Sequence, residues 1–123
     1  MINATSIAFT GYPVTDIVRA RAFYEEVLGL KTGDTWEHEG RHWIEYDLGP
    51  ATLAISDMSA QWKPSSDGPS VALEVADFEA AIATLREHKV TFDLEPMDSP
   101  VCRLAIIHDP DGNSIAIHRR NAS

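Results

Sequence analysis

The sequence predicts an α+β fold made of two copies of one βαβββ module, and two observations support this prediction. Hydrophobic periodicity and turn residues give the order strand, helix and three strands, followed by the same order again. The stretch VTDIVRARAFYEE at 14–26 also matches VADFEAAIATLRE at 75–87, with a separation of 61 residues. TLAIS at 52–56 also aligns with SIAIH at 114–118, with a separation of 62 residues. We therefore expect an internal duplication.

Two helices are expected, each preceded by an Asp that can cap its first turn. Asp16 precedes the helix at 17–28, which should stop at Gly29, and Asp77 precedes the helix at 78–88. The apolar periodicity predicts these buried positions: Val18, Ala22, Phe23 and Val27 in the first helix, and Ala81, Ile82 and Leu85 in the second.

Eight strands are expected from short apolar or alternating runs between turn residues. They cover residues 7–12, 32–37, 43–48, 52–56, 70–75, 91–95, 103–108 and 114–118. The turns between them include EGR at 39–41, GPA at 49–51 and DPDGN at 109–113. In the last of these, Pro110 fixes φ and Gly112 tolerates a left-handed conformation, which is typical of a type I turn.

The length of the chain predicts one domain, 1–123, with a single core. Within it we expect module 1 at about 5–57, a linker rich in Ser, Pro and Asp at about 58–68, and module 2 at about 69–120. The single cysteine and the lack of a signal peptide or membrane-spanning run favour a cytoplasmic protein.

The charge balance restricts the partners that the sequence predicts. Ten Lys and Arg residues against nineteen Asp and Glu residues give a formal net charge of −9. This charge repels nucleic acid and anionic lipid, so we expect neither nucleic acid nor a membrane as a partner. It favours a neutral or cationic small molecule as the ligand.

The stretch YPVTDIVRARAFYEEVLGL, followed by DPDGNSIAIH, resembles the vicinal oxygen chelate superfamily over nearly the whole chain. That superfamily groups glyoxalase I, extradiol dioxygenases, methylmalonyl-CoA epimerase, and the fosfomycin and bleomycin resistance proteins. The resemblance implies that the mixed sheets of the two modules curve around a cleft. It also implies a homodimer, because a partner commonly completes the cleft. It does not choose a reaction, since this scaffold hosts many.

In metal-dependent members of this superfamily, His, Gln or Glu side chains from the first and fourth strand of each module hold a divalent ion. Counting from the two motifs places these ligand positions at Phe9, Ala54, Ser70 and Ala116. Phenyl and methyl groups offer no lone pair, and a neutral Ser hydroxyl is a poor ligand. We therefore expect neither a metal nor another cofactor, as in the bleomycin-resistance type of member.

His118 and Glu74 are candidates for catalysis. Strand alternation places His118 on the face of Ala116, and it places Glu74 on the face of Ser70. The two side chains are able to form an acid/base pair, or His118 is able to recruit a metal to a displaced site with Glu45 or His42. The alternative is that His118 is a strand-end residue that bonds to backbone or water.

The stretch HEGRHWIEYDLG concentrates aromatic and titratable side chains around a hairpin. Either Trp43 and Glu45 on one face, or His42 and Tyr46 on the other, are expected to line a binding site. Sheet packing is the alternative role for the aromatic residues. Trp62 in the linker is either a lid or an anchor that pins the loop.

The leading hypothesis is a metal-independent small-molecule binding protein of the resistance or sequestration type. Its expected pocket comprises Phe9, Trp43, Glu45, Ala54, Ser70, Ala116 and His118. The rival is a glyoxalase-, lyase- or epimerase-like enzyme, or one related to dioxygenases, with a rebuilt site. A third possibility is a structural or regulatory dimer without a ligand.

Overall fold

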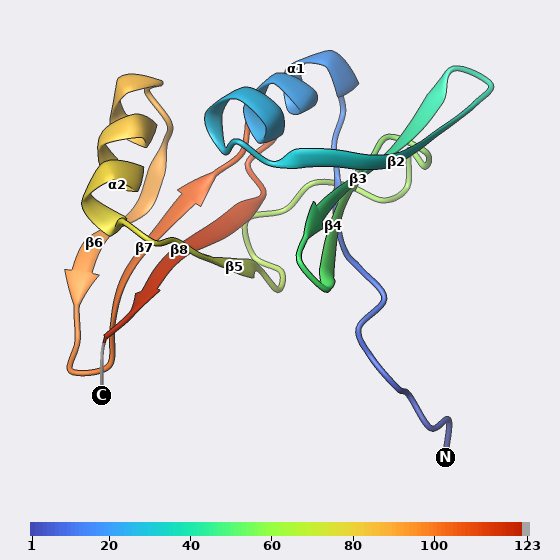
Figure 1. The fold of residues 1–123 in the computed structure, drawn as a ribbon. Coiled ribbons are helices and arrows are strands. Elements are labelled where there is room, and N and C mark those ends of the chain that lie inside the picture. Colours follow the sequence, from blue (N-terminus) through green and yellow to red (C-terminus); the bar gives the residue numbers. More distant parts are fainter. Residues whose placement is uncertain (122–123) are drawn as a thin grey trace. The chain divides into compact units, whose positions relative to one another are not determined.

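The computed structural model describes residues 1–121, and the chain forms two compact units that divide between Pro64 and Ser65. The first unit contains β1 (Thr10–Pro13), α1 (Ile17–Arg21), the π-helical segment η1 (Ala22–Val27), β2 (Lys31–His38), β3 (Arg41–Leu48) and β4 (Ala51–Ser56) (Figure 1). The second contains β5 (Val71–Glu74), α2 (Phe78–Glu87), β6 (Phe92–Asp98), β7 (Cys102–His108) and β8 (Ser114–Arg120). Within residues 1–121, the helices lack the length and hydrophobicity that a membrane-spanning helix requires.

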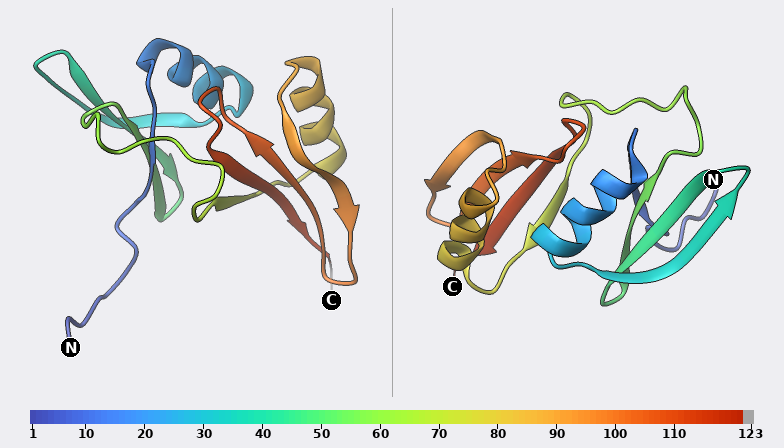
Figure 2. Two further views of the ribbon diagram at one scale, coloured as in Figure 1. Left: turned by 180° about the vertical axis from the view of Figure 1, so that it is seen from behind. Right: turned by 90° about the horizontal axis from the view of Figure 1, so that it is seen from above.

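Each unit is one βαβββ module with a mixed four-stranded sheet, which confirms the predicted α+β class. The strand orders are β1-β4-β3-β2 and β5-β8-β7-β6, with the first strand of each module parallel to its fourth. Figure 2 shows the helical segment of each unit running along its own sheet. The register repeats as well: Gly11 lies opposite Ala54, and Ala72 lies opposite Ala116. The internal duplication is therefore confirmed at the level of individual strand pairs.

Both predicted helix caps are present. The carboxylate of Asp16 accepts a hydrogen bond from the backbone N–H of Arg19 at 3.1 Å, and that of Asp77 accepts one from Ala80 at 3.0 Å. The first helical segment stops before Gly29, as predicted, and this glycine has a φ of 73°. Glycine adopts this left-handed conformation at little cost because it has no Cβ.

The buried face of the first helix differs from the prediction. Val18 is 77% exposed and Ala22 is also exposed, whereas Ala20 and Tyr24 are fully buried beside Phe23. From Ala22 onward the segment is π-helical, with a wider hydrogen-bonded turn than an α-helix. Ala20, Phe23 and Tyr24 have the i, i+3, i+4 spacing of one helix face, so the prediction was wrong because it started the buried face at Val18.

The first strand is shorter than predicted, since β1 begins at Thr10 and residues 7–9 lie outside it. Its one neighbour is β4, whose register with β1 starts at Leu53 opposite Thr10. The ladder with β4 therefore does not include residues 7–9, although β4 itself begins at Ala51. The remaining strands overlap their predicted ranges.

The DPDGN turn closes the β7–β8 hairpin as predicted. The N–H of Gly112 donates to the carbonyl oxygen of Asp109 at 3.0 Å, and Gly112 has a φ of 88°. The side chain of Asn113 is buried, and its Oδ1 accepts a hydrogen bond from the N–H of Ser65 at 3.2 Å. The turn therefore also holds the first residue of the second unit.

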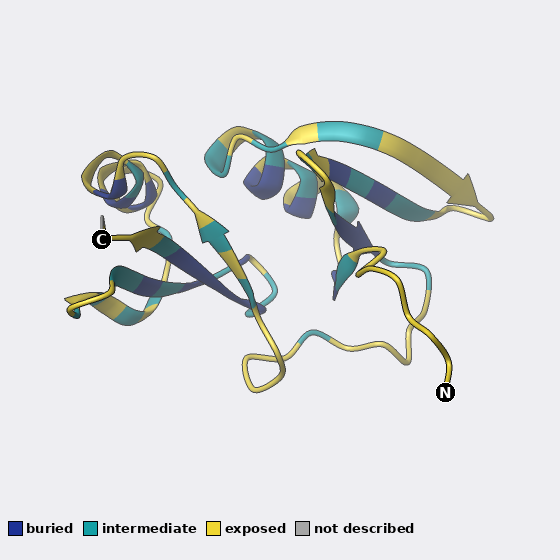
Figure 3. Cartoon of the chain, turned by 60° about the horizontal axis from the view of Figure 1, so that its bottom comes forward, coloured by how far each residue is buried: buried dark blue, intermediate teal, exposed yellow. Residues whose placement is uncertain are grey.

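The core of the first unit is organised around Tyr46, which is fully buried on β3. Figure 3 shows in dark blue where buried residues occur along the strands and helices. The Tyr46 ring stacks on that of Tyr24 with centroids 5.9 Å apart. Its hydroxyl donates to Glu25 Oε2 at 2.9 Å, and Arg21 Nε donates to the same oxygen at 2.6 Å. These contacts fasten the helical segment to one face of the sheet.

The pKa values of this cluster follow from its contacts. Burial and the adjacent Glu25 raise the pKa of Tyr46 well above its ordinary value. Burial alone would raise the pKa of Glu25, but the hydrogen bonds from Arg21 and Tyr46 outweigh it, so that this pKa is lowered. The folded protein therefore favours the charged form of Glu25.

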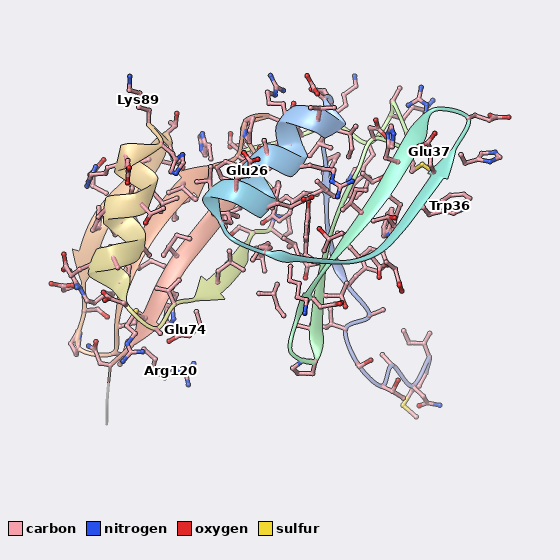
Figure 4. All side chains as sticks on the ribbon, turned by 45° about the horizontal axis from the view of Figure 1, so that its top comes forward. Glu26, Trp36, Glu37, Glu74, Lys89 and Arg120 are labelled. Atoms are coloured by element: carbon pink, nitrogen blue, oxygen red, sulfur yellow. The ribbon has the colours of Figure 1, made fainter. Side chains whose placement is uncertain are left out.

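Replacing Glu25 by Gln should lower the free energy of unfolding by about 2 kcal/mol near neutral pH, because it removes a carboxylate with charge-assisted hydrogen bonds. Because the pKa of Glu25 is lower in the folded than in the unfolded protein, its charged form stabilises the fold at pH values above the unfolded-state pKa of about 4.3. This stabilisation is lost as the pH falls through the folded-state pKa. Urea unfolding of wild type and Glu25→Gln over a pH series should show their difference shrinking in acid. Glu26→Gln, at the exposed position labelled in Figure 4, is the matched control. A difference that stays constant with pH would contradict the prediction.

Candidate functional site

The face of the first sheet opposite the helix carries the candidate site. Tyr46 packs under the helical segment, and side chains alternate along a strand, so Trp43 and Glu45 project from the other face of β3. Glu45 lies opposite Ala54 on β4, which in turn lies opposite Gly11 on β1. Of the two predicted alternatives, Trp43 and Glu45 therefore belong to the face that the helix leaves open.

Three aromatic side chains form what we call the aromatic cluster, of which the first and last lie over Gly11: Phe9, Trp43 and Trp62. Phe9 meets Trp43 edge to face, with ring centroids 5.0 Å apart and planes at 86°. A Cβ added to Gly11 would lie 2.9 Å from Cη2 of Trp62 and 3.3 Å from Cε2 of Phe9. Glycine at position 11 thus lets both rings approach the strand.

The aromatic cluster presents a large apolar surface with one acidic group beside it. Phe9 is 45% exposed and Trp62 is 39% exposed. The indole N–H of Trp43 donates to Glu45 Oε2 at 2.9 Å, which orients both side chains. A carboxylate accepts several hydrogen bonds, so Glu45 keeps capacity for a donor group on a ligand.

Trp36 extends this face and was not predicted as a site residue. It lies opposite Trp43 in the β2–β3 register, so both side chains project from the same face. It is 57% exposed, and its ring stacks on that of His38 with centroids 5.5 Å apart. Figure 4 shows it on β2 towards the hairpin. A sequence signal existed, since the three tryptophans of the chain all fall between residues 36 and 62.

His42 belongs to a different environment from Glu45. Its Nδ1 lies 3.2 Å from Asp57 Oδ2, and its Nε2 lies 3.6 Å from Glu37 Oε2. Alternation along β3 points His42 away from the face that carries Glu45. These two residues therefore do not share a site in the first unit.

In the second unit, Glu74 and His118 lie opposite each other in the β5–β8 register, and their side chains are in contact. Nδ1 of His118 is hydrogen-bonded to Glu74 Oε1, while Glu74 Oε2 accepts the backbone N–H of Arg120 at 2.7 Å. Figure 4 shows Glu74 and Arg120 side by side. The Arg120 N–H, and next the His118 ring, lower the pKa of Glu74. The carboxylate thus stays charged and orients the imidazole.

The positions that the family resemblance assigns to metal ligands do not fit a divalent ion. Ala54 and Ala116 are buried strand residues, and Phe9 and Ser70 directly precede β1 and β5. This set supplies one neutral hydroxyl as a donor atom. Among residues 1–121, no group of three or more His, Cys, Asp or Glu side chains is placed to hold a metal ion.

The family of the chain follows from a match over most of its length. Residues 6–117 match the family model of the Glyoxalase/Bleomycin resistance protein/Dioxygenase superfamily. The chain therefore belongs to this superfamily, and the predicted family is confirmed. No curated protein matches the sequence.

Solved structures with the same fold include two proteins from Streptomyces sp. CB03234. One is TnmS3, an antibiotic binding protein, with 24% identity, coverage of 98% of this chain and 100% of that chain, and a TM-score of 0.81. The other is a glyoxalase/bleomycin resistance protein with 27% identity, coverage of 91% and 98%, and a TM-score of 0.75. The trypanothione-dependent glyoxalase I of Leishmania major has 25% identity, coverage of 94% and 87%, and a TM-score of 0.73. The fold is thus shared by binding proteins and enzymes.

Proposed function

We propose that this protein binds a small planar molecule without a metal ion, in a resistance or sequestration role. The observation that carries the proposal is the aromatic cluster over Gly11, on the sheet face that the helix leaves open. The antibiotic-binding relative TnmS3 supports a small-molecule ligand for this fold. We retain the predicted homodimer as part of the proposal.

The chemistry of the cluster favours a flat ligand. Aromatic side chains offer large apolar areas at little conformational cost and prefer edge-to-face or offset contacts with other rings. Ala54 and Gly11 are small residues, and the rings of Phe9 and Trp62 pack directly over Gly11, so a flat ligand would bind against the exposed faces of these rings. Glu45 at the edge accepts a hydrogen bond from a neutral donor or pairs with a cation. The contribution of Ser70, Ala116 and His118 to the same pocket stays a prediction.

The uncharged dye N-phenyl-1-naphthylamine should bind the protein with a rise in dye fluorescence. Trp43→Ala and Trp62→Ala should each weaken its affinity by about tenfold, since each removes a large apolar contact with the ring. Fluorescence titration of the dye measures both effects.

Val18→Ala is the control for these two variants, because Val18 is an exposed apolar residue on α1, away from the cluster. Thermal unfolding of each variant establishes that it is folded. Unchanged dye affinity in both tryptophan variants would overturn the proposed site, whereas loss of affinity in Val18→Ala would show non-specific binding.

Metal independence is a separate part of the proposal, and the donor set at the four family positions supports it. Protein incubated with zinc, nickel and manganese and then desalted should retain less than about a tenth of an equivalent of any of them. Elemental analysis by plasma mass spectrometry gives this ratio. Near-stoichiometric metal would contradict metal independence.

The contact between Glu74 and His118 favours a second candidate function, that of an acid/base enzyme. A carboxylate on Nδ1 fixes the tautomer of an imidazole and leaves Nε2 free to move a proton. In this candidate, His118 abstracts a proton next to a carbonyl of the substrate, and Glu74 stabilises the resulting imidazolium. Because the superfamily includes glyoxalase I, the adduct of methylglyoxal and glutathione is the first substrate to test.

If the second candidate is correct, the protein should isomerise this adduct, and His118→Ala and Glu74→Gln should each reduce the rate at least about a hundredfold. The thioester product is followed by its ultraviolet absorbance. His88→Ala, at an exposed histidine at the end of α2, should keep the wild-type rate. Absence of turnover by wild-type protein would rule out this reaction.

A further inference from the structure

A pocket of about 480 Å³ lies beside the aromatic cluster, and Trp62 belongs to both. Its walls come from the β2–β3 hairpin, the residues that follow β1 and the loop that follows β4. A turn between Ser59 and Trp62 sets the position of the indole, with the Trp62 N–H 3.3 Å from the Ser59 carbonyl oxygen. A ligand that covers Trp62 therefore reaches this pocket.

Two cationic side chains line the pocket. Arg41 begins β3 after a two-residue turn in which Glu39 and Gly40 have φ values of 51° and 77°, as in a type I′ hairpin. Nη1 of Arg41 donates to the carbonyl oxygen of Asp57 at 2.9 Å, which leaves other guanidinium N–H groups available. Lys63 is exposed, and within residues 1–121 its ammonium has no ion-pair partner.

Two carboxylates, those of Asp57 and Glu39, also line the pocket, the first engaged within the protein and the second exposed at the hairpin tip. Asp57 accepts the backbone N–H of His42, and its other oxygen lies 3.2 Å from Nδ1 of the same residue. The side chain of Glu39 is 84% exposed at the tip of the hairpin. An anionic group inside the pocket therefore meets N–H donors of Arg41 and Lys63, while the Asp57 carboxylate is already engaged.

We infer that the ligand carries an anionic oxygen group, which enters this pocket while its planar part covers the aromatic cluster. This inference rests on the proposed function and names the chemistry of its ligand. The net charge of −9 acts against an anion at long range. However, the screening length is about 8 Å in physiological salt, so the groups that line the pocket matter most, and among them Arg41 and Lys63 supply the charged N–H donors for an anion.

The inference is tested with two dyes that share one aromatic skeleton. N-phenyl-1-naphthylamine is uncharged, and 8-anilinonaphthalene-1-sulfonate carries a sulfonate on the same rings. Lys63→Met should weaken the sulfonate dye by about threefold, and Arg41→Met with Lys63→Met by about tenfold. The affinity of the uncharged dye should change less than about twofold in both variants, because they keep the aromatic cluster.

Lys89→Met is the matched control, because it removes an exposed lysine from the second unit, at the position labelled in Figure 4. It should leave both affinities unchanged. Thermal unfolding identifies any variant that is not folded, in which case Lys63→Glu in the loop replaces the double variant and should weaken only the sulfonate dye.

Each outcome of the titrations decides between the two proposals. A loss confined to the sulfonate dye supports the anionic group. Equal effects on both dyes, or no effect on either, would overturn the inference that the ligand has an anionic group. The proposal that the protein binds a planar ligand would not be affected. Binding of neither dye to wild-type protein overturns both proposals.

Discussion

The packing of Tyr46 beneath the first helical segment decides which face of the first sheet carries the aromatic cluster. Its ring stacks on Tyr24 and its hydroxyl donates a hydrogen bond to Glu25, so this side of β3 faces the core. Because side chains alternate along a strand, Trp43 and Glu45 must then lie on the opposite face. A shift of one residue in this register would bury Trp43 and Glu45 and expose the core residues.

The duplicated modules place different chemistry at equivalent strand positions. The pair Glu74 and His118 in the second unit corresponds in register to Pro13 and Ser56 in the first. Neither Pro13 nor Ser56 is an acid or base near neutral pH, and the hydroxyl of Ser56 donates to the backbone carbonyl oxygen of His42. The two units therefore share one backbone pattern but carry different side chains. The first unit has an aromatic surface, and the second has a Glu–His pair.

The features that could be predicted from the sequence are those that depend on local rules. The caps at Asp16 and Asp77, the stop at Gly29 and the repeat register follow from residue type and spacing. The position of Trp62 over Gly11 does not, because a contact across 51 residues depends on the path of an irregular loop. The wide π-helical turn was likewise missed, since its hydrogen bonds break the 3.6-residue period.

Phe9 stands at a position that the family resemblance assigns to a metal ligand, and it belongs to the aromatic cluster. The family resemblance places a metal ligand at this position, and a phenyl ring supplies no lone pair to an ion. The same ring is in edge-to-face contact with Trp43 and lies against Gly11 beside Trp62. One residue thus removes a donor atom and completes an aromatic wall. Ala54, at the second such position of this module, lies opposite Glu45 and adds only a buried methyl group. At these two positions the chain therefore has apolar groups that pack into the sheet and the aromatic cluster, in place of atoms that could coordinate an ion.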